Sequence, residues 1–323
     1  LGRGRGCYGR PMAEAVLRVV QLNIGSLLEP GWDERRHEIV AWLSELDPDV
    51  VCLQEVWEDD NAPNTAGWLA DALRKVEADA TGSADAAEPE RGWYWRFGGR
   101  PFGERLWPGS TLAFGSAVLS RWPIDQVTYH ALPVDESDAD DPFVTDVPWE
   151  LLHVRTAGLD LFSCHLASAP RDGLHRRRQV VAIDAAITAA TAGGRATPGK
   201  RREGMPPILC GDFNAEPDSD EVRFLAGLTP LDGRTTFYQD AWRVAGDGSP
   251  GHTQDWRTNS TAAALNVHRK RIDYVWVGDP FQRQGSAGRV LSARLAFHEA
   301  RTGVLASDHA GLVVEVVWPD RPA

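Results

Sequence analysis

Alternating apolar and polar stretches along the chain predict a layered α/β protein. Short apolar runs at residues 17–23 and 49–55 are typical of strands, and each run ends in polar residues. Residues 33–46 lie between them and are expected to form a helix with Asp33 as its N-cap. The apolar stripe of this helix, at spacings of three and four, consists of Ile39, Val40, Leu43 and Leu46. The order strand, helix, strand is typical of α/β structure.

The same pattern predicts the remaining elements. Helices are expected near residues 64–77 and over residues 174–191. Further strands are expected at residues 116–119, within 151–166, and at 208–211, 272–277 and 312–318, with loops between 212 and about 270. Polar or charged segments at 78–91, 135–146 and 193–204 are predicted to be solvated loops. No internal repeat or long linker divides the chain, so we expect one domain over residues 16–323 after a disordered extension over residues 1–15.

Composition narrows the class of protein. Of the 323 residues, 42% are hydrophobic and 25% are charged, as in an ordinary globular protein. No apolar stretch approaches the roughly 18 residues of a membrane helix, and the basic first residues lack the apolar core of a signal peptide. A cytoplasmic protein without a transmembrane segment is therefore expected. The formal charge of −12 argues against a protein that holds nucleic acid mainly through phosphate contacts, although a bound cation changes the local sign of an acidic site.

The four cysteines are expected to be reduced. No two of them form a CxxC pair, and Cys52, Cys164 and Cys210 lie inside apolar runs. Burial as free thiols is favoured over disulfides, with a catalytic or metal-binding thiol as the alternative.

Polar residues stand beside apolar runs at six places in the chain. The first four runs end in polar residues, and the last two begin with them. If the last two strands run antiparallel to the first four, all of these residues gather at one mouth of the sheets, where functional residues tend to lie. They are Asn23, Glu55, His165, Asp212, Asp273, Asp308 and His309.

Each of these residues, taken alone, has a purely structural explanation. The asparagine could form a turn, a glutamate could be a solvated surface group, and a histidine could be hydrogen-bonded within the fold. Asp273 could form a surface ion pair with Arg271. Together, however, Glu55, Asp212 and Asp308 would repel one another without a cation. Oxygen ligands favour Mg²⁺ or Mn²⁺, whereas zinc would require more His or Cys at short spacings.

The ordered motifs resemble a known family. The segments LNIG, LQEV, SCHLAS, GDFNAEP, RIDYVWV and SDHAGL are similar to those of the endonuclease/exonuclease/phosphatase superfamily of metal-dependent phosphohydrolases, over about residues 16–318. The resemblance implies a DNase I-like, four-layer α/β/β/α sandwich of two mixed, mostly antiparallel sheets. Runs such as VVCLQ and YVWV agree with it, because they are typical of strands buried on both faces.

The resemblance also implies roles for the residues that match the motifs. Glu55 would hold the metal ion, Mg²⁺ with Mn²⁺ as the alternative, and Asn23 and Asp308 would support the metal site or its water. A phosphate ester is the implied substrate, and no protein partner is indicated.

The remaining matched residues would act on the reacting phosphate and on water. Asp212 would orient or deprotonate the attacking water, and Asn214 would hold that water or a phosphate oxygen. His165 and His309 would donate hydrogen bonds to the phosphoryl group, and Asp273 would hold the ring of His309.

The resemblance favours a phosphodiesterase. Abasic-site endonucleases of the family carry LQETK and a tyrosine at the position of His165, whereas here Val56 and Trp57 follow Glu55. The chain is more similar to the branch of DNase I-like nucleases, sphingomyelinase-like phosphodiesterases and small-molecule or RNA-tail phosphohydrolases. The alternatives are a phosphomonoesterase for a lipid or small-molecule phosphate, and a non-catalytic binding protein on the same fold.

Two features near the motifs are left open. Thr253 and Trp256, in the loop over residues 252–259, either line the substrate pocket or serve packing. Many family members have a carboxylate that pairs with the first histidine, but Glu104, the nearest acid upstream of the turn at Ser120, gives no secure match.

Overall fold

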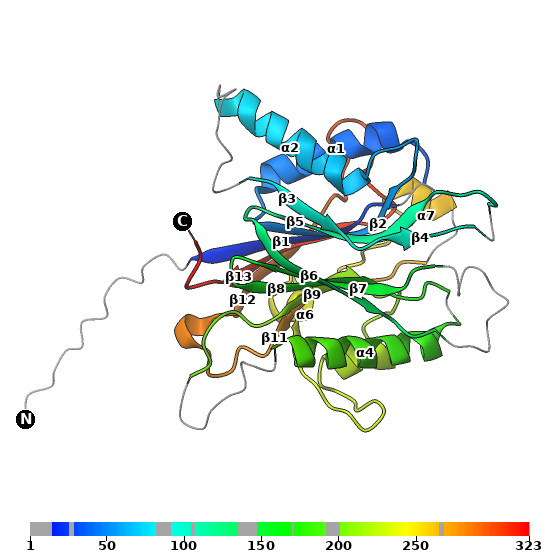
Figure 1. Cartoon of the computed structure of the whole chain (residues 1–323). Helices are drawn as coiled ribbons and strands as arrows, with labels where there is room; N and C mark the ends of the chain where they lie inside the picture. The colour runs from blue at the N-terminus through cyan, green and yellow to red at the C-terminus, as the bar shows by residue number, and fades with distance from the viewer. Residues whose placement is uncertain are drawn as a thin grey trace, which may run out of the picture.

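Two β-sheets stacked face to face form the centre of the molecule, and helices cover both outer faces (Figure 1). The computed structural model describes residues 15–25, 29–81, 92–104, 107–134, 147–169, 171–191, 201–264 and 268–322. The expected α/β sandwich of two mixed sheets is confirmed.

Within the described residues, the first sheet contains both the first and the last strand. Its order is β12 (Val290–Ala296), β13 (Gly311–Val317), β1 (Val16–Asn23), β2 (Val50–Glu58), β5 (Ala113–Ser120) and β3 (Tyr94–Phe97), with β4 (Arg100–Pro101) paired to β5. Strands β1 and β2 run parallel, and the other pairs are antiparallel.

The second sheet is built from the middle of the chain. Its order is β10 (Tyr238–Asp240), β11 (Asp273–Gly278), β9 (Ile208–Asp212), β8 (Leu159–His165), β7 (Glu150–Thr156) and β6 (Ile124–Ala131). Strands β8 and β9 run parallel, and the other pairs are antiparallel.

Three apolar clusters hold these layers together. The middle cluster lies between the sheets and includes Leu17, Cys52, Leu161, Cys210, Val275 and Val314. A second cluster joins the first sheet to α1 (Trp32–Leu46) and α2 (Thr65–Thr81). A third joins the second sheet to α4 (Gly173–Thr191) and α5 (Asp220–Leu225). The central strands are therefore buried on both faces, which explains their continuous apolar runs.

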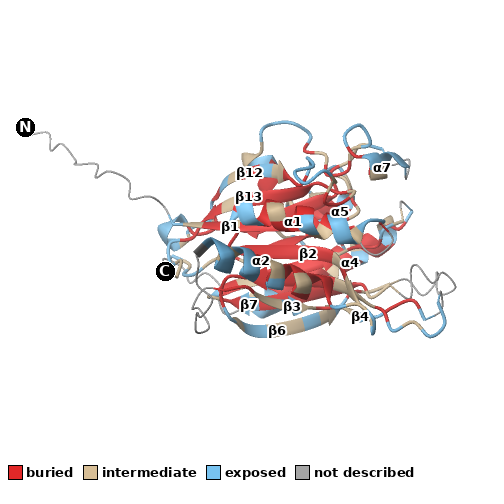
Figure 2. Ribbon diagram, turned by 90° about the horizontal axis from the view of Figure 1, so that it is seen from above, coloured by how far each residue is buried: buried red, intermediate tan, exposed pale blue. Residues whose placement is uncertain are grey.

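The predicted helices and central strands are present, but edge elements were missed. Strand β6 has only intermediate and exposed positions, as Figure 2 shows, and β12 mixes buried, intermediate and exposed ones, so neither forms an apolar run. Residues 151–166 form two strands, joined at Ala157 and Gly158, which both have positive φ. The region predicted as loops contains α5, β10, α6 (Ala241–Ala245) and α7 (Ser260–Ala264); a short 3₁₀ turn, η3 (Gln284–Ser286), precedes β12.

The prediction that Asp33 caps α1 is wrong. The helix begins at Trp32 after Gly31, whose left-handed backbone (φ 77°) turns the chain into the helix, and no side chain caps this end. Asp33 lies in the first turn and pairs with Arg36 at 2.8 Å, where its charge is favourable to the helix dipole.

Cys52, Cys164 and Cys210 are buried and free, as expected. Burial raises the pKa of the Cys164 and Cys210 thiols well above the ordinary value, which opposes thiolate chemistry. Cys7, the N-terminal extension up to residue 14, the acidic segment 135–146 and most of the loops at 78–91 and 193–204 lie outside the described residues, and the single-domain assignment stays a prediction. Within the described residues, no helix is long and apolar enough to cross a membrane.

Gly211 permits the close approach of β9 to β8. A Cβ atom at this position would lie against the carbonyl oxygen of Cys164, closer than van der Waals contact allows. We expect Gly211→Ala to lower the free energy of unfolding by about 1–3 kcal/mol in chemical denaturation, because the backbone of one strand must shift. The matched control is Gly173→Ala, where the nearest atom to a Cβ is Glu221 Oε1 at 3.7 Å. Equal stability of the two variants would contradict this account of the strand contact.

Candidate active site

The strand directions bring the predicted residues to one edge of the stacked sheets. Strand β13 runs antiparallel to β1, and β11 runs antiparallel to β9, so the starts of the last two strands meet the ends of the first ones. In the second sheet Asp212 pairs in register with both His165 and Asp273. The arrangement assumed from the sequence is therefore the one that the structure has.

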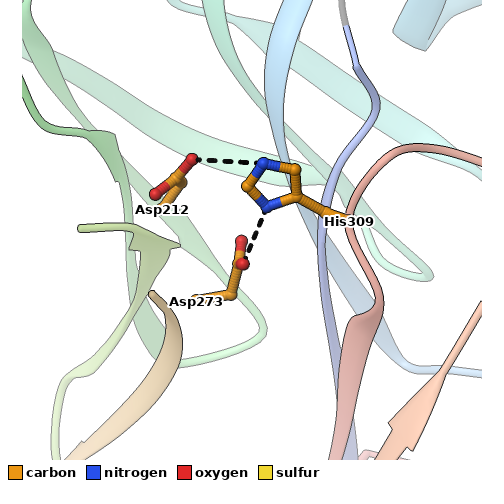
Figure 3. Close-up of side chains that lie close together, drawn as sticks. All are labelled: Asp212, Asp273 and His309. Carbon is orange, nitrogen blue, oxygen red and sulfur yellow. Dashed lines mark hydrogen bonds and ion pairs between the residues drawn. The ribbon is translucent and has the colours of Figure 1, made fainter. Parts of the chain in front are cut away.

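A buried histidine–aspartate pair occupies the centre of this edge. Nδ1 of His309 lies 2.8 Å from Oδ2 of Asp273, and Nε2 lies 3.8 Å from Oδ2 of Asp212 (Figure 3). Burial by itself lowers the pKa of His309, but Asp273, Asp308 and Asp212 more than offset it and raise the pKa well above the ordinary value. Asp273 thus fixes the orientation of the ring.

Two glutamines that the sequence analysis did not assign to the site connect the sheets beneath it. Nε2 of Gln21 donates to Oδ1 of Asp273 at 2.9 Å and to Oε1 of Gln54 at 2.8 Å. Nε2 of Gln54 donates to the hydroxyl of Ser163 at 3.1 Å. The only sequence signal was a polar residue inside each of two apolar runs.

Asn23 holds two carboxylates from different sheets. Its Nδ2 donates to Oε1 of Glu55 and to Oδ2 of Asp212, each at 3.0 Å, and its Oδ1 accepts from the backbone N–H of Gly25 at 3.0 Å. A single amide therefore fixes the two carboxylates close together.

Glu55 lies in a β-bulge. The register of β2 against β5 shifts between Leu53 and Val56, and Glu55 has a left-handed backbone with φ 58°. Such a conformation is unusual for a non-glycine residue and re-aims its side chain, as is common beside functional sites. The sequence pattern of alternating positions could not reveal this bulge.

Asp212 has a histidine on either side. Oδ2 of Asp212 lies 3.6 Å from Nε2 of His165 and 3.8 Å from that of His309. Oδ1 accepts from the backbone N–H of Asn214 at 2.8 Å. The side-chain amide of Asn214 contacts Nε2 of His165 at 3.1 Å and donates to the carbonyl of Leu166 at 3.0 Å. Asn214 is held in the left-handed region (φ 47°), which asparagine tolerates better than most residues.

Besides Asp212, a second acid lies across the strand pair from His165, and it is Glu150 rather than Glu104. Glu104 lies elsewhere, where its carboxylate accepts from the N–H of Gly109. Glu150 begins β7 one residue before Leu151, the partner of Cys164, so it lies across the ladder from His165. Glu150 is buried and paired with Arg100. Among the described residues, its Oε1 and Nδ1 of His165 are both buried without a hydrogen-bond partner.

The ring of His165, whose Nε2 lies near Asp212, is also held by packing. It meets the ring of Trp149 edge to face, with centroids 5.6 Å apart. Glu150 therefore supplies charge near this histidine, and Trp149 limits the positions of its ring.

The loop before β11 contributes one buried and one exposed residue from the predicted pair. Thr253 is 1% exposed, and its hydroxyl accepts from the backbone N–H groups of Ile272 and Asp273 at 3.1 and 3.3 Å. It therefore fixes the start of β11 rather than lining a pocket. Trp256 is 49% exposed, with the guanidinium of Arg257 5.4 Å from its ring.

Asp308 is joined to the site by Gln254, another residue that the sequence analysis missed. Nε2 of Gln254 donates to Oδ2 of Asp308 at 3.2 Å and contacts Nε2 of His309 at 2.7 Å. Oδ1 of Asp308 accepts from the hydroxyl of Ser307 at 3.3 Å. No pattern in the sequence distinguishes Gln254 from an ordinary loop residue.

The carboxylate oxygens at this edge of the sheets suit a hard divalent cation as ligands. The carboxylates of Glu55 and Asp212 converge on the amide of Asn23, and oxygen ligands of this kind fit Mg²⁺ or Mn²⁺. One ligand atom each from Asp212, Asp273 and His309 also lie within 4.8 Å of one another. Asp273 and His309 already form a hydrogen bond with each other. We therefore favour a position for the ion next to Glu55.

Solved structures share this fold at low sequence identity. An endonuclease/exonuclease/phosphatase from Beutenbergia cavernae DSM 12333 has 21% identity and a TM-score of 0.60, covering 94% of this chain and 72% of that one. The human Nocturnin catalytic domain with bound sulfate anion has 19% identity and a TM-score of 0.60, covering 94% and 93%. D. rerio TDP2 complexed with single strand DNA product has 17% identity and a TM-score of 0.59, covering 94% and 99%.

No curated protein matches the chain in a sequence search. Residues 20–309 match the sequence model of one family, and this match spans most of the chain. The chain therefore belongs to the Endonuclease/Exonuclease/phosphatase family and is a phosphoric ester hydrolase.

Proposed function

We propose that this protein is a divalent-metal-dependent phosphodiesterase that uses Mg²⁺ or Mn²⁺. One observation carries the proposal: the Asp212 carboxylate lies between two imidazoles and shares the Asn23 amide with Glu55. This combination offers a base, two hydrogen-bond donors and a cation site within one cluster.

Glu55, with Asn23 and Asp308 in support, would hold the ion. A divalent cation there supplies positive charge that offsets the repulsion between an anionic ester and an acidic site. Asp212 orients the attacking water and accepts its proton as the water oxygen bonds to phosphorus and the bond to the leaving oxygen breaks. The backbone N–H of Asn214 donates to Oδ1 of Asp212 and fixes this carboxylate. The side-chain amide of Asn214 contacts His165.

The two histidines stabilise the charge that develops on the phosphoryl oxygens. His309 is suited to this role because the carboxylates around it raise its pKa and Asp273 holds its ring at 2.8 Å. Nε2 of His165 lies 3.6 Å from the same oxygen of Asp212. Both imidazoles would therefore lie near a phosphoryl group bound beside Asp212.

A nucleic acid is the first diester to test. The similar fold of D. rerio TDP2 is complexed with single strand DNA product. Trp256 with Arg257 offers an exposed aromatic surface in the loop before β11, and stacking on such a surface contributes about 1–3 kcal/mol per base. A phosphomonoesterase for a lipid or small-molecule phosphate is the second candidate, because the same cluster also suits a terminal phosphate.

Substrate class is tested by plasmid nicking with and without Mg²⁺. We expect metal-dependent nicking that the Asp212→Ala protein lacks, together with faster hydrolysis of bis(p-nitrophenyl) phosphate than of p-nitrophenyl phosphate. Preference for the monoester would overturn the diesterase. Absence of nicking at high enzyme concentration, with the diester still cleaved, would redirect the search to sphingomyelin and other non-nucleic diesters.

Each central side chain is tested by truncation. We expect His165→Ala, Asp212→Ala and His309→Ala each to lower kcat by at least about a hundredfold, since removing one preorganised donor typically costs that much. His298→Ala is the matched control, because this histidine is exposed and pairs only loosely with Glu299 at 3.8 Å. A variant of the three with near-normal turnover would remove that residue from the mechanism.

Metal binding is tested at Glu55. We expect Glu55→Gln to weaken Mn²⁺ binding by at least about tenfold in calorimetry. Loss of a residue that supports a metal ligand already lowers metal affinity by about this factor, and loss of the ligand itself should lower it at least as much. The control is Glu58→Gln, at the end of the same strand. Unchanged affinity in Glu55→Gln would exclude this residue as a ligand.

A further inference from the structure

The side chain of Arg35 lies buried beneath the loops that carry two residues of the metal site. It is 4% exposed, although it belongs to the first half of α1. Its guanidinium donates to five backbone carbonyls, those of Ile24 (2.6 Å), Pro30 (3.0 Å), Glu29 (3.1 Å), Ala306 (3.1 Å) and Gly25 (3.4 Å). The hydrogen-bonding groups of this arginine are directed to the chain itself and not to solvent.

These carbonyls belong to two segments far apart in the sequence. Ile24 and Gly25 directly follow Asn23, whereas Ala306 precedes Asp308 by two residues. A planar guanidinium presents its donors in a fixed fork, so it sets the spacing of the two segments more strictly than a lysine ammonium could.

Glu29 completes the connection. Its Oε2 lies 3.2 Å from NH1 of Arg35 and accepts the backbone N–H of Asp308 at 3.2 Å. It packs against Gly25, where a Cβ atom would collide with this carboxylate and where φ is 72°. The carboxylate therefore touches the loop after β1, α1 and the loop before β13.

Stability alone is a weak explanation for this pair. A buried ion pair loses hydration, and apolar replacements of similar volume are often as stable. Burial lowers the pKa of Arg35 below its ordinary value, while the carboxylates of Glu29, Asp308 and Glu55 act in the opposite direction. The pair thus lies in electrostatic contact with the site and is hydrogen-bonded to the backbone on both sides of it.

We propose that Arg35 and Glu29 form a positioning clamp that fixes Asn23 and Asp308 relative to each other and thereby sets the affinity of the site for a divalent cation. The inference rests on the proposed function. Neither residue touches the substrate, and both act through the two backbone segments that they join.

The test compares Arg35→Lys and Glu29→Ala with Arg36→Lys. Arg36 is the next residue of α1 and pairs at the surface with Asp33, which is 77% exposed in its side chain. Mn²⁺ affinity is measured by calorimetry, and hydrogen exchange is followed in peptides covering residues 23–25 and 306–309. We expect a loss of about 10–100-fold in Mn²⁺ affinity and faster exchange in both segments for the two clamp variants. Arg36→Lys should match the wild type.

The outcomes distinguish a positioning role of Arg35 and Glu29 from a purely structural one. They also distinguish failure of the clamp proposal from failure of the proposed function. Clamp variants that lose stability while keeping wild-type Mn²⁺ affinity would overturn the proposal. If Arg35→Lys does not fold, Glu29→Ala decides the matter, because Glu29 lies at the margin of the buried region. Neither measurement uses substrate. A wild-type protein that binds Mn²⁺ but cleaves no phosphate ester would therefore refute the proposed function and leave the clamp intact.

Discussion

The contacts of one buried carboxylate, that of Asp273, are the main constraint on this structure. Asp273 is fully excluded from solvent between the sheets, where a charge without partners would be very costly. Its partners are Gln21 of the first sheet and His309 of the loop before β13, while Thr253 fixes its backbone. The stacking of the sheets, the start of β11 and the orientation of the His309 imidazole therefore all depend on this carboxylate.

The residues around Asp212 form a single coupled unit. Asn23, Asn214 and the two histidines all lie within contact distance of this carboxylate. Substitutions at groups that share a partner are not additive, because each change alters the environment of the others. A substitution at one member of the cluster is therefore expected to change the environment of the others.

The elements that could be predicted from the sequence are those whose burial produces a regular pattern of apolar residues. Central strands such as β9 and β11 are apolar at successive positions because both faces are covered, so their place and the polar residues at their ends were predictable. Strands β6 and β12 lie at sheet edges and carry no such run. The bulge at Glu55, the packing of Arg35 and the role of Gln254 depend on contacts between distant segments, which no local pattern encodes.

The pairing of β1 with β13 has a consequence for how the protein is made. The first strand of the chain lies between β2 and the last strand, and Val16 pairs with Val317. During synthesis, this edge of β1 therefore stays without its β13 partner until residues 311–317 are made, and such unpaired edges favour association with other strands. Contacts this distant also slow folding. A chain that stopped before residue 309 would lack both His309 and the strand that covers β1, so the centre of the candidate site and the protection of this edge are completed together.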